Sequence, residues 1–559
     1  MIRKSTTIAT AFLALAGCRP ERPADWVIRN TAVYTMAASP ARVEAIAIRD
    51  GVIAYLGSNA GADSLVGDST EVIDLGGRMV LPGFHDTHVH PSGGIGMGEC
   101  NLDGLPRQAI MDSIASCART APTATWIRGR GWELPVFPAG NPRREWLDSL
   151  VPDRPVWLEA ADGHSAWVSS KALELAGVTR ETADPPNGRI ERDPDGRPSG
   201  TLRESAVALV ERHLPPYTDQ ERQDGLLRAL ALANSFGITT VHDASTRPEM
   251  LAAWSALDQA GRLTARVIAT QYVSPDRGLD QVDSLVAWRR RYPGTSYFRP
   301  DAAKLFADGV IEARTAALLE PYVGSDSRGT PNFRPGQLDS LVTAIDAAGI
   351  RIHIHAIGDR AIRMALDAIE RARAANGPSD RRPIIAHIQL FDPADIPRFE
   401  ALGVVASFQP LWAFADSYIT ELTEPVLGPE RSRWLYPIRS VVESGAVVAA
   451  GSDWTVSSMN PLEAIQVAVT RRGPDAEPGE AWIPEETVDL ETMLKAYTVN
   501  GAWAALDERV TGTLEVGKAA DLVVLDKNLY EVPVTEIGKT RVLLTLLDGK
   551  TVYVDRALR

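Results

Sequence analysis

LPGFHDTHVHP, residues 81–91, is the segment of this chain from which the fold and the chemistry are most directly inferred. In a β-strand, residues i and i+2 point to the same face. His88 and His90 therefore converge on one side, where two imidazoles can chelate one cation, whereas His85 has the opposite parity and is not expected to be a ligand. The alternative interpretation is a His-X-His pair on the protein surface.

Outward from this segment, the sequence alternates between helical spacing and short apolar runs. Apolar spacing predicts helices that end at glycines such as Gly237 and Gly349, each followed by a strand. Eight strands in this alternation predict an α/β fold, a (β/α)8 TIM-type barrel with its active site at the carboxyl ends of the strands. The predicted strands are 84–90, 238–241, 264–270, 302–307, 350–356, 383–388, 404–408 and 446–450. The Pro-, Trp- and Arg-rich stretch at about 95–215 breaks the pattern and predicts an insertion after the first strand.

Both ends of the chain are β-rich, unlike the middle. Apolar runs around Asp50-Gly51 and Asp548-Gly549 indicate hairpins. Residues 26–82 and 508–559 are therefore predicted to meet in one small β-sandwich domain. The barrel is predicted to occupy residues 83–507.

The composition narrows the classes of function. The chain has 559 residues, 45% hydrophobic and 23% charged, which is typical of a globular protein and long for one compact domain. With 58 Lys and Arg against 72 Asp and Glu the net charge is −14, so no nucleic acid partner is expected. Three cysteines exclude a cysteine-rich zinc site.

The first eighteen residues are predicted to be a lipoprotein signal peptide. Arg3 and Lys4 precede an apolar run too short to span a bilayer, and the run ends at Leu-Ala-Gly-Cys18, which resembles a bacterial lipobox. We therefore expect acylation of Cys18, a membrane attachment through this lipid anchor, and a location in the bacterial cell envelope facing the periplasm. The alternative is an ordinary signal peptide with a chance cysteine. In an oxidising compartment Cys100 and Cys117 could pair, although their spacing alone does not show it.

Further candidate metal ligands fall at the ends of other predicted strands. His355, His387 and Asp453 end the fifth, sixth and eighth strands, where a barrel brings residues together. A single histidine of this kind can equally be a hydrogen-bonded core residue. His353 has the same parity as His355 and is the rival ligand, but it lies one layer deeper, which favours His355.

Lys304 is an unusual residue because it lies within an apolar strand. A buried ammonium is costly unless it is paired or neutralised. A neutral lysine can react with carbon dioxide to form a carbamate, an anion able to bridge two metals, which arginine cannot do. The alternative is a lysine that forms a salt bridge or extends to solvent.

These residues together resemble the amidohydrolase superfamily, in the branch that includes YtcJ-like proteins and N-substituted formamide deformylases. Beyond the opening segment the resemblance rests on GITTVHDA (237–244), KLFADG (304–309), HIHAIGD (353–359), AH (386–387), GSD (451–453) and GTLEVGKAADLVVL (512–525). It covers nearly the whole chain after the signal peptide. The most specific feature of the resemblance is the order of the ligands, which fall on strands one, four, five, six and eight.

The resemblance implies a ligand set and a mechanism. His88, His90 and Asp453 would bind the more buried metal, His355 and His387 the second, and carboxylated Lys304 would bridge them. Imidazole and carboxylate ligands suit two Zn²⁺ ions, with Fe, Mn or Ni as alternatives. Metal-activated hydroxide would attack the substrate carbonyl while Asp453 accepts the water proton and passes it to the leaving nitrogen.

Three residues are predicted to contact the small-molecule substrate. Trp132 and His164 lie in the insertion segments RGWE (130–133) and DGHSAW (162–167), which resemble motifs of this branch, and Trp454 follows Asp453. Packing alone is the alternative for each.

The predicted function is hydrolysis of a carbon–nitrogen bond of amide or N-formyl type. Mononuclear deamination of a cyclic amidine, an esterase or lactonase activity, and a non-catalytic solute-binding lipoprotein remain alternatives. A homodimer is also possible.

Overall fold

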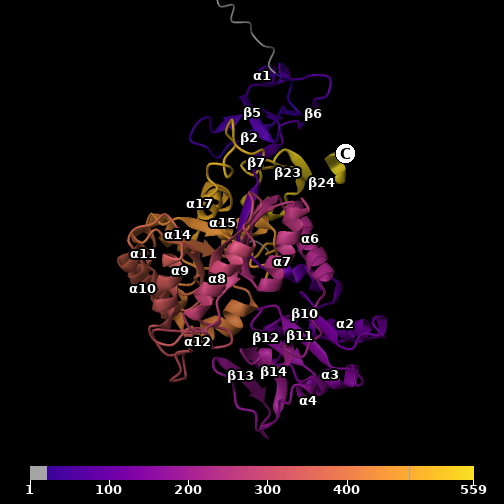
Figure 1. Cartoon of the computed structure of the whole chain (residues 1–559), viewed down its shortest axis with the longest axis vertical. Helices are drawn as coiled ribbons and strands as arrows, with labels where there is room; N and C mark the ends of the chain where they lie inside the picture. Colours follow the sequence, from indigo (N-terminus) through magenta and orange to yellow (C-terminus); the bar gives the residue numbers. More distant parts are fainter. Residues whose placement is uncertain (1–21, 477–478, 559) are drawn as a thin grey trace, which may run out of the picture.

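The structure is a computed structural model that describes residues 22–476 and 479–558. Cys18, the predicted site of acylation, lies outside the described residues. Figure 1 shows three parts along the long axis: a β domain that contains both ends of the described chain, a central barrel, and an insertion at the opposite end. Within the described residues, no helix combines the length and the apolar character that crossing a membrane requires.

The central part is a barrel of eight parallel strands, which confirms the predicted fold class. Neighbouring strands pair in the order β8, β15, β16, β17, β18, β19, β20, β21. Their bounds are β8 (Phe84–Val89), β15 (Ile238–Thr246), β16 (Arg266–Tyr272), β17 (Phe298–Phe306), β18 (Arg351–Ala356), β19 (Ile384–His387), β20 (Val405–Phe408) and β21 (Val448–Ala450). The helices of the barrel region are α6 (Asp219–Ser235), α7 (Pro248–Gln259), α8 (Asp280–Arg291), α9 (Gln337–Ala347), α10 (Asp359–Asn376), α11 (Ile396–Ala401), α12 (Glu424–Leu427), α13 (Pro429–Ser432), α14 (Ile438–Glu443), α15 (Pro461–Thr470), α16 (Leu490–Tyr497) and α17 (Val499–Ala505).

The last strand closes on the first through hydrogen bonds at the carboxyl end of the barrel. The Asp453 N–H donates to the His88 carbonyl at 2.7 Å, and the Thr87 hydroxyl donates to the Ala450 carbonyl at 3.0 Å. A Cβ added at Gly451 would lie 2.6 Å from the backbone nitrogen of His88, so this approach requires a residue without a side chain. Closure therefore sets the distance between the two segments that carry His88 and Asp453.

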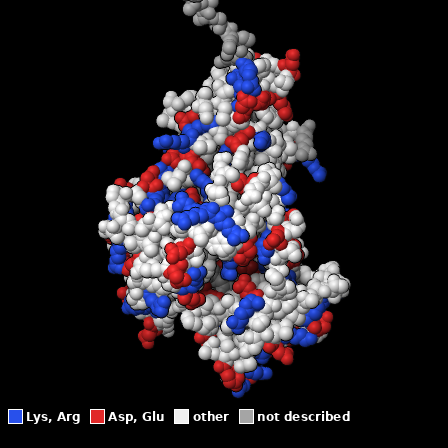
Figure 2. Space-filling view, viewed as in Figure 1, with Lys and Arg blue, Asp and Glu red and all other residues white. Residues whose placement is uncertain are grey.

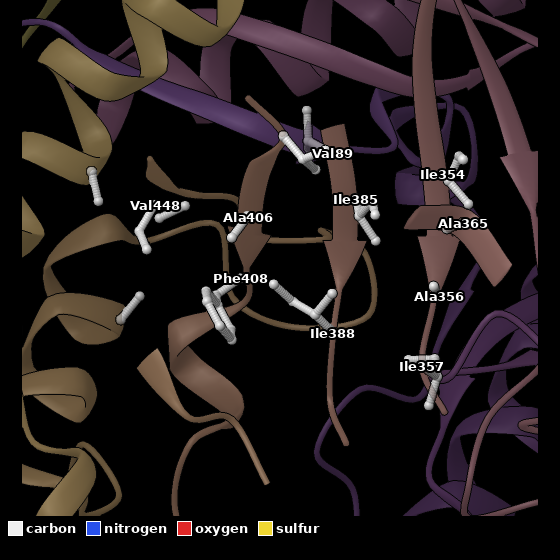
Figure 3. Packing of buried hydrophobic residues seen from close by; sticks show 14 of the residues in the cluster. Val89, Ile354, Ala356, Ile357, Ala365, Ile385, Ile388, Ala406, Phe408 and Val448 are labelled. Carbon is white, nitrogen blue, oxygen red and sulfur yellow. The ribbon is translucent and has the colours of Figure 1, made fainter. Parts of the chain in front are cut away.

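The apolar core lies between the strands and the helices around them. Figure 3 shows apolar side chains of successive strands, such as Ile354, Ile385 and Phe408, with Ala365 of α10. Because side chains alternate along a strand, these residues leave their neighbours His355, Ala386 and Ser407 on the other face. The alternation explains how one strand serves both the core and the inner face of the barrel.

The β domain unites the two ends of the chain in two sheets. One sheet has the order β5 (Val52–Gly57), β4 (Ala45–Arg49), β1 (Trp26–Arg29), β6 (Glu71–Asp74), and the short helix α1 (Asn59–Asp63) follows β5. The other has the order β24 (Lys550–Val554), β23 (Val542–Leu547), β22 (Leu522–Leu525), β7 (Met79–Pro82), β2 (Ala32–Tyr34), β3 (Arg42–Val43). Residues of both sheets share one apolar core. Arg266 of the barrel joins this domain through ion pairs with the buried Asp521 at 3.0 Å and with Asp548 at 2.6 Å.

The insertion forms a mixed sheet of its own, which the sequence pattern did not predict in detail. Its strands, in sheet order, are β13 (Gly188–Arg192), β14 (Pro198–Glu204), β12 (Ser165–Val168), β11 (Val156–Ala160), β10 (Ile127–Trp132) and β9 (Cys100–Asn101). Helices α2 (Arg107–Thr120), α3 (Arg144–Leu150), α4 (Ser170–Leu175) and α5 (Ala208–Glu211) accompany them. Cys100 and Cys117 form a disulfide that ties β9 to α2, with their Cα atoms 5.7 Å apart.

Charged side chains of both signs are interspersed on the face seen in Figure 2.

Candidate metal centre

Three side chains form a compact group of potential metal ligands where β8 meets the end of β21. The Asp453 Oδ1 atom lies 3.0 Å from Nε2 of His90 and 3.4 Å from Nε2 of His88. One ligand atom from each of the three residues lies within 4.8 Å of the others. The i, i+2 spacing of the two histidines thus produces the convergence that strand parity predicts.

Lys304, His355 and His387 complete the predicted set around the same point. Nζ of Lys304 lies 3.0 Å from Nε2 of His88. The His387 ring centroid is 4.5 Å from that of His88 and 4.5 Å from that of His355. The structure therefore brings together all six residues that the sequence identified, from strands or strand ends that span β8 to β21.

Hydrogen bonds outside this group fix which ring nitrogen each histidine presents. His88 Nδ1 lies 2.8 Å from Nε2 of His353, and His387 Nδ1 lies 2.9 Å from Oε1 of Gln409. Each contact leaves Nε2 as the ring nitrogen available to the ligand group, where that of His88 meets Nζ of Lys304. His355 Nε2 lies 3.2 Å from the Gly309 carbonyl, which leaves Nδ1 free. Such second contacts orient metal-binding imidazoles and select their tautomers. His353, the rival ligand in the sequence, thus lies behind His88.

Burial keeps the nitrogen donors uncharged. It holds the pKa values of His88, His355 and His387 well below the ordinary value, and nearby Lys304 lowers them further. Burial also lowers the pKa of Lys304 to about 7. Metal ligands must be deprotonated, so these shifts favour cation binding. The buried Asp453 Oδ1 makes no hydrogen bond among the described residues although two imidazole nitrogens lie close to it. Acceptor atoms gathered in this way fit a cation between them.

Asp86 was not singled out from the sequence, although it lies within the opening segment. Its carboxylate accepts hydrogen bonds from the backbone N–H of His88 at 3.1 Å and of Ser452 at 3.0 Å, and from the Ser452 hydroxyl at 2.5 Å. Burial raises the pKa of Asp86 to about 7 in spite of these bonds. Asp86 therefore links the two segments that carry the compact ligand group.

The comparisons with known proteins agree with this fold. A protein-family model described as the Amidohydrolase family matches residues 71–553. The chain belongs to this family. Protein LONG AFTER FAR-RED 3 of Arabidopsis thaliana is 34% identical over 95% of this chain and 92% of its own length. N-substituted formamide deformylase of Arthrobacter pascens is 28% identical over 95% of this chain and 98% of its own length. The structure of an uncharacterized metal-dependent hydrolase from Pyrococcus furiosus superposes with a TM-score of 0.69 at 26% identity, over 90% of this chain and 99% of that one.

In this amidohydrolase the ligand group opens into a cavity of about 1020 Å³ between the barrel and the insertion. His90, His355, His387 and Asp453 lie on its wall. The volume suits a small organic molecule. The insertion therefore helps to enclose the place where a substrate would meet the ligands.

His164, one of the three predicted substrate contacts, lines this cavity. Its ring centroid is 5.4 Å from that of His355, and its Nδ1 lies 2.8 Å from Oε2 of Glu204. The Thr315 hydroxyl in turn donates to Oε1 of Glu204 at 2.7 Å. Burial by itself would lower the pKa of His164, but the Glu204 carboxylate raises it to about 9. His164 is thus held in place as a cation at the edge of the ligand group.

The other two predicted substrate contacts lie elsewhere, which corrects the expectation for them. Trp132 is fully buried in the core of the insertion, where it packs against Phe137 and Trp167 and donates to the Leu158 carbonyl at 3.0 Å. Trp454 carries the Arg130 guanidinium over its ring at 5.5 Å and is not among the residues that line the cavity. The sequence positions of Trp132 and Trp454 did not reveal whether their side chains face the cavity or the packed interior.

Three of the aromatic side chains on the cavity wall come from the segment after β20, which the sequence did not lead us to expect. Trp412 stacks on His387 with 5.7 Å between ring centroids, and Phe414 and Tyr418 follow it on the wall. The signal available in the sequence was their position directly after a barrel strand, where functional loops of this fold lie.

Proposed function

We propose that this chain hydrolyses a carbon–nitrogen bond of amide or N-formyl type with the help of divalent cations. The observation that carries the proposal is the convergence of His88, His90 and Asp453 with Lys304, His355 and His387 at the base of a cavity of about 1020 Å³. The similarity to N-substituted formamide deformylase along nearly the full length supports the amide or formyl class.

The donor set suits Zn²⁺, because it combines imidazoles and a carboxylate without cysteine. His88, His90 and Asp453 would hold one ion, and His355 and His387 a second. A bound divalent cation of this kind polarises a carbonyl group and lowers the pKa of a water molecule towards neutrality.

Lys304 supports a pair of cations rather than a single one. Its pKa of about 7 leaves a large share of the amine neutral at physiological pH, the form that adds to carbon dioxide and releases a proton. The resulting carbamate would carry a negative charge between the two histidine groups. A mononuclear deaminase, the alternative enzyme class, gives this residue no role.

Asp453 and His164 are the side chains that we assign to the chemistry itself. The Asp453 carboxylate lies beside His88 and His90 and can accept a proton from water and return it to the leaving nitrogen. His164, held by Glu204, can donate a hydrogen bond to a substrate oxygen from the cavity side.

The decisive experiment combines metal analysis with a substrate screen. We expect close to two metal ions per chain in the purified protein, and turnover of at least one N-formyl, N-acyl or cyclic amide. Lys304→Met should reduce both the metal content and the turnover, whereas Trp132→Phe, a change in the core of the insertion, should leave both unchanged. A chain with a full metal complement that cleaves only esters, or that binds amides without consuming them, would contradict the proposal.

A further inference from the structure

The charge of the cavity wall is unbalanced. Of the described residues that line it, ten are Asp or Glu, four are Arg and none is Lys. The arginines already contact other groups: Arg128 lies over Tyr217, Arg130 over Trp454, Arg247 over Tyr272, and Arg222 pairs with Asp219. The carboxylates of the wall therefore outnumber its arginine and lysine side chains.

Glu312 is a positioned carboxylate on this wall. Its Oε1 atom accepts hydrogen bonds from Nε2 of Gln389 at 3.0 Å and from the Thr423 hydroxyl at 2.7 Å. Its second oxygen has no hydrogen-bond donor, and its carboxylate no ion pair, among the described residues. Two neutral donors thus orient the side chain without compensating its charge.

Asp416 is a second carboxylate on the same wall, and it lies just before the helical segment Tyr418–Thr423, whose last residue donates to Glu312. Its Oδ1 atom accepts from the backbone N–H of Ile419 at 2.9 Å. Burial, with smaller contributions from Glu312 and Glu133, raises the pKa of Asp416 to about 6 against the effect of the backbone N–H groups of Ile419 and Tyr418. Its carboxylate forms no ion pair among the described residues. A carboxylate that is buried without a cationic partner costs free energy, which a cationic ligand would recover.

Tyr436 provides an independent observation at the same place. The residue is only 2% exposed, it lines the cavity, and its hydroxyl has no hydrogen-bond partner among the described residues. Its backbone N–H donates to the Gln389 carbonyl at 2.9 Å, and the Gln389 side chain donates to Glu312 at 3.0 Å, so Tyr436 and Glu312 contact the same residue on the cavity wall. Together with the aromatic rings of Trp412 and Phe414, these groups offer the hydrogen-bond acceptors and the aromatic faces that proteins use to bind ammonium groups.

We propose that Glu312, Asp416 and Tyr436 form a subsite for a protonated amine of the substrate. The inference rests on the proposed function, and it narrows the substrate class to amides that carry a second, cationic amino group. His355 and His387 of the ligand group line the same cavity as these three residues, so one small substrate can reach both places. A short alkyl chain can therefore join an amide at the ligand group to an ammonium at the subsite.

A matched pair of substrates tests the subsite in turnover. N-formyl-1,5-diaminopentane and N-formylhexylamine have similar length and differ in the terminal ammonium. Because a charge-assisted hydrogen bond contributes about 1.5–3 kcal/mol, we expect a preference of roughly tenfold to a hundredfold in kcat/KM for the cationic substrate. Glu312→Gln and Asp416→Asn should each reduce this ratio at least fivefold. Glu99→Gln, which changes a carboxylate beside Tyr217 elsewhere on the wall, should preserve it.

Binding to the metal-loaded protein tests the subsite without turnover. Choline and 3,3-dimethyl-1-butanol share a shape and differ in charge, and neither presents an amine that can coordinate a metal. Calorimetry should show tighter binding of choline, lost in Glu312→Gln. Equal binding of the two probes, or equal turnover of the two formamides, would overturn the subsite and leave the proposed function standing. Selective choline binding without hydrolysis of any amide would instead contradict the proposed function alone.

Discussion

The pair formed by His164 and Glu204 allows a quantitative prediction. Glu204→Gln removes the charge that keeps His164 protonated while preserving the shape of the side chain. The pKa of about 9 lies roughly 2.5 units above the ordinary value for histidine, which corresponds to about 3 kcal/mol. The two side chains are only 16% and 11% exposed, so solvent screens little of this interaction.

The direction of the pH dependence follows from both shifts. Because the pKa of His164 is raised by folding, its contribution is complete below about pH 6.5 and is lost as the pH rises through about 9. The pKa of Glu204 is lowered: burial acts to raise it, but His164 outweighs that effect. The contribution of Glu204 is therefore complete above its ordinary value and is lost as the pH falls through the lowered pKa. The wild type should exceed Glu204→Gln in stability by about 3 kcal/mol near pH 6 and by almost nothing at pH 10.

Two measurements check this prediction in the metal-free protein. Urea denaturation at pH 6 and pH 10 gives the difference in stability between wild type and variant. Diethyl pyrocarbonate acylates neutral imidazole, so peptide mapping by mass spectrometry should show His164 modified only as the pH approaches 9 in the wild type and already near neutrality in the variant. Glu99→Gln serves as the control. Identical pH profiles for the wild type and Glu204→Gln would refute the assignment of His164 as a cation.

Three further predictions follow from other contacts. Asp453→Asn should lower kcat by about 10²–10⁴ in an amide hydrolysis assay, because the amide cannot accept the water proton, and turnover close to that of the wild type would contradict this role. Cys100 and Cys117 should resist thiol titration in the folded protein, and replacing both by serine should destabilise the insertion by about 3 kcal/mol, given their separation of 17 residues, as measured by limited proteolysis against temperature. Arg266→Met should destabilise the protein by about 3–5 kcal/mol in urea, since it leaves Asp521 buried without a cationic partner, and adding Asp521→Asn should restore part of the loss.

The barrel and the ligand group were predictable from the sequence because both depend on local periodicity. The parity of His88 and His90 on β8 fixes their common face, and the alternation of strands and helices fixes which strand ends meet. The position of His353 behind His88 was predictable only in part. Strand parity shows that His353 shares a face with His355, but it does not show a contact with a residue on a distant strand. The burial of Trp132 was not predictable, because the insertion packs its aromatic residues through contacts that no periodicity records.

The subsite residues were likewise not predictable from the sequence. Glu312 and Asp416 lie in irregular segments, where neither parity nor helical spacing constrains the direction of a side chain. Their proximity depends on the paths of two loops that leave different strands. Such proximity is a property of the tertiary structure alone.

The hydrogen bond from Asp453 to the His88 carbonyl has a consequence for the biogenesis of the protein. Two of the three compact ligands emerge from the ribosome with residues 88–90, whereas the third follows more than three hundred and fifty residues later. A nascent chain that lacks β21 cannot offer the complete ligand group to a metal, whatever the metal concentration around it. Metal uptake by the compact group would therefore report that synthesis and barrel assembly have passed the last strand, and a product truncated before Asp453 would lack the metal of this group.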